Sequence, residues 1–90
     1  MTNKRVTFEM TGNVSAKSID RGIKYKKDFI AWARKFGWEH TSIESMPTYL
    51  IASKEGTKKH QFANRYGIEI ISYEDALDMM EDIRYKISLI

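Results

Sequence analysis

Seven basic residues lie within nineteen positions of this 90-residue chain. They are Lys17, Arg21, Lys24, Lys26, Lys27, Arg34 and Lys35. A cluster of this density presents a positive field, and the chemistry that it suits is contact with phosphate groups. Charge alone does not choose between DNA, RNA and an acidic protein as the binding partner.

The net charge of +3 is unevenly distributed along the chain. Residues 1–66 hold 13 Lys and Arg against 6 Asp and Glu, net +7, whereas residues 67–90 hold 2 against 6, net −4. An ordinary protein surface with an acidic last helix would give the same numbers. That interpretation stays open beside an anion-binding surface.

Residues that could perform catalysis are few. Cysteine is absent, so there is no thiol nucleophile, disulfide or thiolate metal site. His40 and His60 are the only histidines, and the P-loop and dinucleotide-binding glycine signatures are missing. The acidic run at 74–82 alternates with Leu77 and Met80 at helical spacing, which is typical of a solvated helix face. We therefore expect a protein that is not an enzyme and needs no cofactor or metal.

An alternation of strand and helix patterns must position the basic residues. Val6, Phe8 and Met10 alternate with polar residues, which predicts a strand with one face inward. The expected order continues with a loop at 11–24, a helix from about 25 to 36, a weak strand at 40–43, a strand at 48–52, a helix at about 58–66, an apolar strand at 68–71 and a last helix capped by Ser72. Two buried strands bracketing a helix indicate a parallel sheet.

Together with Met10-Thr11-Gly12 after the first strand and Phe36-Gly37-Trp38 after the first long helix, this order resembles a BRCT domain. The resemblance covers about residues 4–80, and is to single domains such as those of ligases and of the large subunit of replication factor C. It implies an α/β fold with a four-stranded parallel sheet flanked by three helices. It also implies a non-catalytic module of DNA replication or repair. Trp38 stands where the family usually has a second glycine, and we predict that it keeps a negative φ and packs its ring into the core.

The resemblance also implies a phosphate-binding cradle. In the family, a Ser or Thr followed by Gly ends the first strand, and these positions are Thr11 and Gly12 here. A lysine near the start of the second helix completes the cradle, and the matching residue is Lys59. Such a set offers a hydroxyl, an open backbone amide and a charge-assisted donor to one phosphate.

In family members that bind 5′-phosphorylated DNA, a basic residue at the start of the first helix also contributes. Lys26 matches that position, with Lys27 adjacent. We expect Arg21 and Lys24 to follow the backbone of a duplex, and Lys58 to bind the nucleic acid as well. Contacts of this kind carry no base information, so binding would select a DNA structure rather than a sequence.

Three functions remain open: binding of a 5′-phosphorylated duplex end, binding of a phosphorylated or acidic protein segment, and packing of the helices, together with an exposed Trp38 or Tyr85, on a partner or a second copy. Ninety residues suit one domain, here 1–90. No apolar run approaches 18 residues, so we expect no membrane span. The default location is the cytoplasm, or the nucleoid or nucleus if the protein is DNA-bound.

Overall fold

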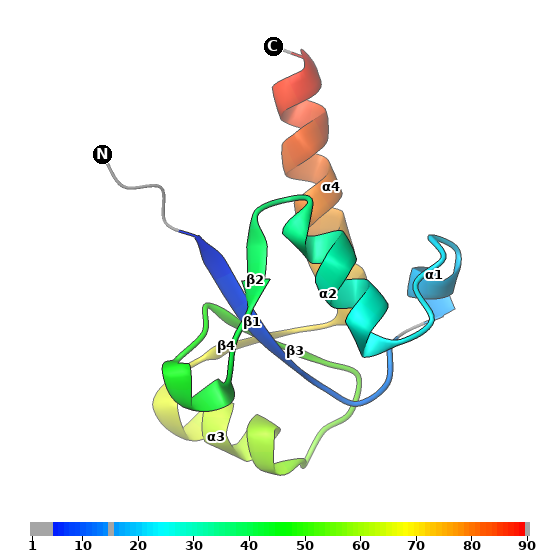
Figure 1. Ribbon diagram of the computed structural model, residues 1–90. Coiled ribbons are helices and arrows are strands. Elements are labelled where there is room, and N and C mark those ends of the chain that lie inside the picture. Colours follow the sequence, from blue (N-terminus) through cyan, green and yellow to red (C-terminus); the bar gives the residue numbers. More distant parts are fainter. Residues whose placement is uncertain (1–4, 15, 90) are drawn as a thin grey trace.

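The computed structural model describes residues 5–14 and 16–89, with side chains described through Glu81 apart from those of Ala16 and Lys17. Four strands form one parallel sheet in the order β2-β1-β3-β4 (Figure 1). They are β1 (Val6–Thr11), β2 (Trp38–His40), β3 (Tyr49–Ala52) and β4 (Glu69–Ile71). The predicted α/β fold with a four-stranded parallel sheet is confirmed.

Helices cover both faces of this sheet (Figure 1). They are α1 (Ala16–Ile19), α2 (Lys26–Arg34), α3 (Lys58–Tyr66) and α4 (Tyr73–Leu89), with a short 3-10 helix, η1, at Ile43–Ser45. One core packs α2 and α4 on the sheet through residues such as Phe29 and Leu77, which share that core with Phe8. A smaller core packs Ala63 of α3 against Leu50 on the other face.

The central strand β1 is buried on both faces. Phe8 and Met10 belong to the core under α2 and α4, whereas Glu9 and Thr11 alternate with them and contact side chains of α3 and its cap. Glu9 is 7% exposed and Thr11 is 6% exposed. The prediction of a strand with only one face inward is wrong, because α3 covers the second face. Glu9 and Thr11 are therefore buried on a face of the strand that we expected to be exposed to solvent.

Trp38 begins β2 and lies in the core. Its ring is 3% exposed and stacks on Tyr49 at a centroid distance of 5.4 Å. Among the described non-glycine residues only Met46 has a positive φ, so the predicted conformation of Trp38 is confirmed. The expected strand at 40–43 starts earlier, because Gly37, at φ 83°, turns the chain and the indole then anchors the edge strand. Docking through an exposed Trp38 is ruled out, and the Tyr85 side chain lies outside the described residues.

The ends of the later helices follow the sequence signals. Thr57 caps α3 by accepting a hydrogen bond from His60 N at 3.1 Å, and Gly67 ends the helix at φ 73°. Ser72 caps α4 by accepting from Asp75 N at 3.0 Å, as predicted. The loop expected at 11–24 differs in that it contains the one-turn helix α1 and buries Ile23.

Candidate functional site

The carboxyl ends of β1 and β3 lie side by side, paired through Thr11 and Ala52. The chain leaves β1 toward α1 and leaves β3 toward α3, and α2 also begins at this edge (Figure 1). In open parallel sheets, such an edge is the usual place for a ligand. The predicted cradle and the predicted DNA-binding lysines would therefore have to meet at this edge.

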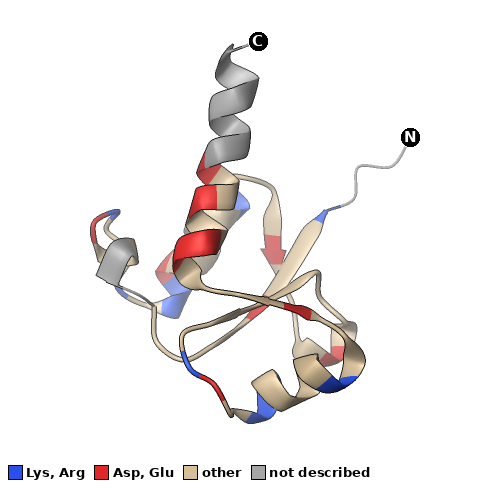
Figure 2. Ribbon diagram, turned by 180° about the vertical axis from the view of Figure 1, so that it is seen from behind, with Lys and Arg blue, Asp and Glu red and all other residues tan. Residues whose placement is uncertain are grey.

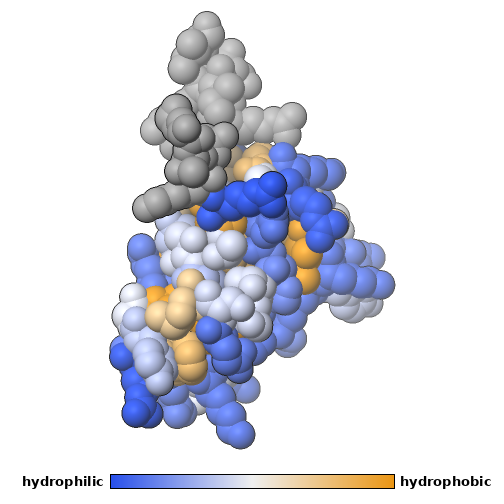
Figure 3. Space-filling model, turned by 60° about the vertical axis from the view of Figure 1, so that its left-hand side comes forward, coloured by the Kyte–Doolittle hydropathy of each residue, from blue (hydrophilic) through white to orange (hydrophobic). Residues whose placement is uncertain are grey.

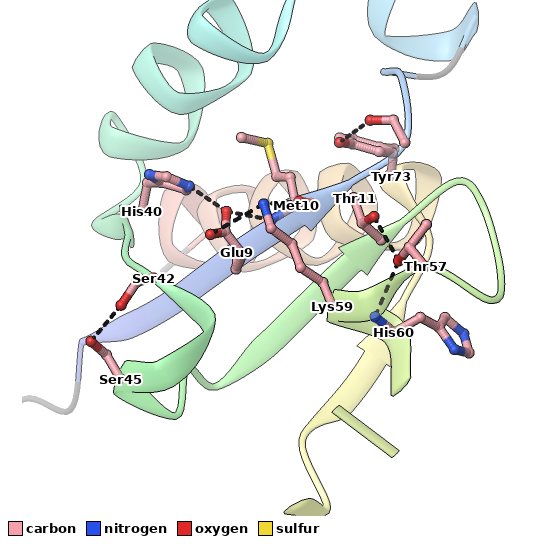
Figure 4. A network of polar contacts seen from close by, with 11 residues as sticks. Glu9, Met10, Thr11, His40, Ser42, Ser45, Thr57, Lys59, His60 and Tyr73 are labelled. Carbon is pink, nitrogen blue, oxygen red and sulfur yellow. Dashed lines mark hydrogen bonds and ion pairs between the residues drawn. The ribbon is translucent and has the colours of Figure 1, made fainter. Parts of the chain in front are cut away.

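Thr11 is held inside the protein. Its hydroxyl donates to Thr57 Oγ1 at 2.8 Å, and the same oxygen accepts the cap hydrogen bond from His60 N (Figure 4). Thr11 thereby joins the end of β1 to the start of α3. Its own proton is used, so the hydroxyl hydrogen of Thr57 is the remaining donor of this pair.

Lys59 reaches from α3 back to the same end of β1. Its Nζ donates to the carbonyl of Met10 at 3.1 Å and lies 3.4 Å from Glu9 Oε2 (Figure 4). The structure thus brings the Lys59 ammonium to the residue that precedes Thr11. The ammonium is already paired with a carboxylate, which a phosphate would have to replace.

Glu9 is the centre of this polar cluster. Its Oε1 lies 2.9 Å from Met10 N and 2.5 Å from His40 Nε2. Burial alone would raise the pKa of the Glu9 carboxyl, but the hydrogen bonds from Met10 N and His40, with the charges of His40 and Lys59, together lower it. Glu9 is therefore a buried anion that pairs with His40 and with Lys59 of the predicted cradle.

Gly12 is fixed by the close approach of two loops. Its φ is 82°, and a Cβ at this position would lie 2.3 Å from Ser53 Oγ. Ser53 in turn donates its hydroxyl to the carbonyl of Asn13 at 2.6 Å. A side chain here would have to displace Ser53, and the β3–α3 loop closes over the backbone of residues 12 and 13.

A hollow of about 690 Å³ opens beside the β1–α1 loop and the start of α2. We call it the lysine hollow, and its lining consists of Asn13, Val14, Ile19, Lys24, Tyr25, Lys26 and Lys27. The three lysines are exposed. No Asp or Glu is found among the described residues that line it. A second hollow of about 460 Å³, at the ends of β3 and β4, is lined by charges of both signs, including Lys54 and Glu74.

The remaining predicted DNA-binding residues are divided. Lys58 is exposed at the first position of α3. Arg21 is instead bound by Glu81 of α4, through Nε at 2.5 Å and Nη2 at 2.7 Å, and this pairing raises the pKa of the guanidinium. Figure 2 shows acidic positions along α4 and basic positions on α3. The structure therefore places Lys24, Lys26 and Lys27 around one hollow, whereas Arg21 is paired with Glu81 of α4.

Four residues of this edge were missed from the sequence: Glu9, Asn13, Tyr25 and Thr57. Thr57 carried a usable signal, because a threonine directly before the first residue of a helix is a typical N-cap. Glu9 carried none, since its burial depends on α3 covering β1. The positions of Tyr25 and Asn13 depend on the path of the loop expected at 11–24, which local sequence patterns do not predict.

Other classes of site find little support. Among residues 5–14 and 16–81, no three His, Cys, Asp or Glu side chains form a group able to hold a metal ion. No helix within the described part of the chain is long and apolar enough to cross a membrane. On the face seen in Figure 3, hydrophobic residues appear as small patches separated by hydrophilic surface.

Comparison of the chain with models of protein families, with curated proteins and with solved structures found no match. The BRCT resemblance therefore stays a prediction, drawn from short motifs and from the order of strands and helices.

Proposed function

We propose that this chain is a non-catalytic DNA-binding module that holds the phosphorylated 5′ end of a duplex at the carboxyl edge of its sheet. The observation that carries the proposal is the lysine hollow, where Lys24, Lys26 and Lys27 are exposed around a lining without a described carboxylate. Three exposed ammonium groups that form no ion pair with a described carboxylate attract a multivalent anion, and a terminal phosphate is the most highly charged part of a duplex.

The side chains of the hollow supply the attraction, more than the helix backbone does. Asp28 Oδ2 already accepts hydrogen bonds from Lys24 N at 3.2 Å and Tyr25 N at 3.1 Å. These amides are occupied, and the carboxylate partly offsets the positive end of α2. Contact with phosphate therefore falls to the ammonium groups, which reach beyond the helix end.

Lys59 of the predicted cradle and Thr57 provide a second set of contacts at the same edge. Lys59 joins them by exchanging Glu9 for a phosphate oxygen, and Thr57 offers its hydroxyl hydrogen. Lys58, exposed one residue before Lys59, extends the positive surface along α3. The BRCT resemblance independently implies this type of ligand for Thr11, Gly12 and Lys59.

The test is a fluorescence-anisotropy titration at several salt concentrations, with one duplex prepared with and without a 5′-phosphate. The phosphorylated duplex is expected to bind more tightly. The double variant Lys26→Ala with Lys27→Ala should weaken both duplexes and lower the salt slope by up to about 2. Lys35→Ala removes one charge just after α2 ends, and is the matched control for Lys26→Ala and Lys27→Ala made singly. Absence of binding to either duplex at low salt would overturn the proposal.

A phosphorylated or acidic protein segment is the competing ligand, because the same lysines would attract it. A phosphopeptide and its unphosphorylated form are therefore titrated in parallel. Tighter binding of the phosphopeptide than of the phosphorylated duplex, lost in the Lys26→Ala and Lys27→Ala variant, would replace DNA with a protein ligand.

A further inference from the structure

Tyr25 is an exposed aromatic residue on a fixed backbone. Its side chain is 64% exposed, although a large ring normally gains from burial. Its amide donates to Asp28 Oδ2, and its carbonyl accepts from the amides of Asp28 and Phe29 at 3.0 and 3.2 Å. The ring is thus presented at the rim of the lysine hollow from a well-anchored position.

The hollow beside this ring has mixed chemistry. Val14 and Ile19 contribute apolar surface, and Ile19 is 54% exposed. The Asn13 side chain adds an amide that can both donate and accept hydrogen bonds. The volume of about 690 Å³ falls within the range of about 300–1,000 Å³ usual for small-ligand sites. A phosphate group alone would leave the apolar lining and the ring without a partner.

One cation lies over the ring, and two more line the same hollow. Lys24 and Lys26 flank Tyr25 in sequence, and Lys27 Nζ lies 5.9 Å from the ring centroid. Aromatic rings beside lysines are the combination that binds single-stranded nucleic acid, because bases stack on the ring while the cations contact the backbone. A paired base at a duplex end can offer only its outer face, since its inner face and its pairing edge are occupied, whereas an unpaired base can enter the hollow.

We propose that the lysine hollow takes an unpaired nucleotide at the 5′ end, with its base on the Tyr25 ring and its phosphates on Lys24, Lys26 and Lys27. This inference rests on the proposed function and specifies the form of DNA that is bound. The preferred ligand is then a 5′-phosphorylated duplex with a short unpaired 5′ extension. The extension adds base stacking to the charge interactions that a blunt duplex also makes.

The experiment compares blunt and 5′-extended duplexes, both 5′-phosphorylated, with 2-aminopurine in the extension. The extended duplex is expected to bind about tenfold more tightly, with quenching of the 2-aminopurine fluorescence on binding. Tyr25→Ala should abolish both the preference and the quenching, whereas Tyr25→Phe should preserve them because stacking needs the ring and not the hydroxyl. Thermal unfolding of each variant checks that the exposed side chain can be replaced without loss of the fold.

The possible results separate this inference from the function on which it rests. Equal affinity for blunt and extended duplexes, unaffected by Tyr25→Ala but reduced by Lys26→Ala with Lys27→Ala, would overturn the nucleotide site and leave duplex-end binding intact. No binding to any duplex would overturn both. An acidic peptide that binds more tightly than either duplex, and loses affinity in Tyr25→Ala, would assign the hollow to protein instead.

Discussion

The two lysine-bearing regions at the carboxyl edge of the sheet differ in what their ammonium groups already contact. At the start of α3, Lys59 lies 3.4 Å from a buried carboxylate and donates to a carbonyl. At the start of α2, none of the described Asp and Glu side chains forms an ion pair with Lys24, Lys26 or Lys27. The Lys59 ammonium is already paired within the protein, whereas the lysines at the start of α2 present their charge to solvent.

The difference shows that a lysine can belong to a recognisable motif without being available to a ligand. Availability depends on whether an acid reaches the ammonium group in three dimensions. Glu9 lies 50 positions from Lys59 in the sequence, and only the packing of α3 on β1 brings them together. A ligand at Lys59 must compete with Glu9, whereas no described carboxylate forms an ion pair with the lysines of the hollow.

The largest expected effect comes from Gly12→Ala, at the junction of the two regions. Its Cβ would meet Ser53 Oγ at 2.3 Å, and its φ of 82° disfavours alanine, so we expect a loss of about 2–3 kcal/mol in the free energy of unfolding. Gly22→Ala is the control, because it has a φ of 78° with nothing within 4 Å of the added Cβ, and should cost about 1 kcal/mol. Urea denaturation measures both.

Combining Gly12→Ala with Ser53→Ala should recover about 1 kcal/mol, since the closest contact is removed. Equal destabilisation by Gly12→Ala and Gly22→Ala would mean that the two loops do not meet as described.

A second prediction would make the two regions alike. Glu9→Gln removes the negative charge that holds Lys59, and should lower stability by about 1–2 kcal/mol because hydrogen bonds to a buried charge are weakened. We expect affinity for the 5′-phosphorylated duplex to rise severalfold, as Lys59 becomes available. Anisotropy titrations measure the gain, and adding Lys59→Ala should cancel it.

The matched control is Glu39→Gln, which removes an acid that pairs with Arg5 on the surface. It should leave the phosphate preference unchanged. A gain in DNA affinity of the same size in both variants would mean that the effect comes from net charge alone.

A third prediction concerns pH. The pKa of Glu9 is lowered in the folded protein from an ordinary value of 4.5, so its contribution to stability is fully present above that value and is lost as the pH falls through the folded pKa. The stability difference between wild type and Glu9→Gln should therefore shrink as the pH falls below 4.5. Urea denaturation from about pH 3 to pH 7 tests this. A difference that grows on acidification would contradict the assigned direction of the pKa shift.

The smallest effects should separate Arg21 from Lys24. Arg21→Ala breaks a partly exposed bidentate pair with Glu81, so it should cost about 0.5–1 kcal/mol of stability and change DNA affinity little. Lys24→Ala should do the reverse, weakening binding while leaving the unfolding midpoint unchanged. Loss of binding in Arg21→Ala greater than in Lys24→Ala would place the DNA along α1 and α4 instead of at the hollow.

The arrangement of strands was predictable because local signals agree with the global fold. Thr57 and Gly67 mark both ends of α3, and the apolar run before Ser72 marks a buried strand, so periodicity and caps were sufficient. The burial of Glu9 and the engagement of Arg21 were not predictable, because each depends on a partner from a distant helix. The lysines of the hollow were found from charge density, whereas its volume and the place of Tyr25 depend on how the loop at 11–24 folds back on itself.

The two strands at the sheet edges, β2 and β4, are each three residues long. Strands this short expose very few backbone groups to pair with a strand from another molecule, and a charged residue, Glu39 or Glu69, occupies each of them. Edge-to-edge aggregation therefore has almost no template here. Even at high local concentration, copies of the protein would therefore keep their sheets as separate units rather than join them into a fibre.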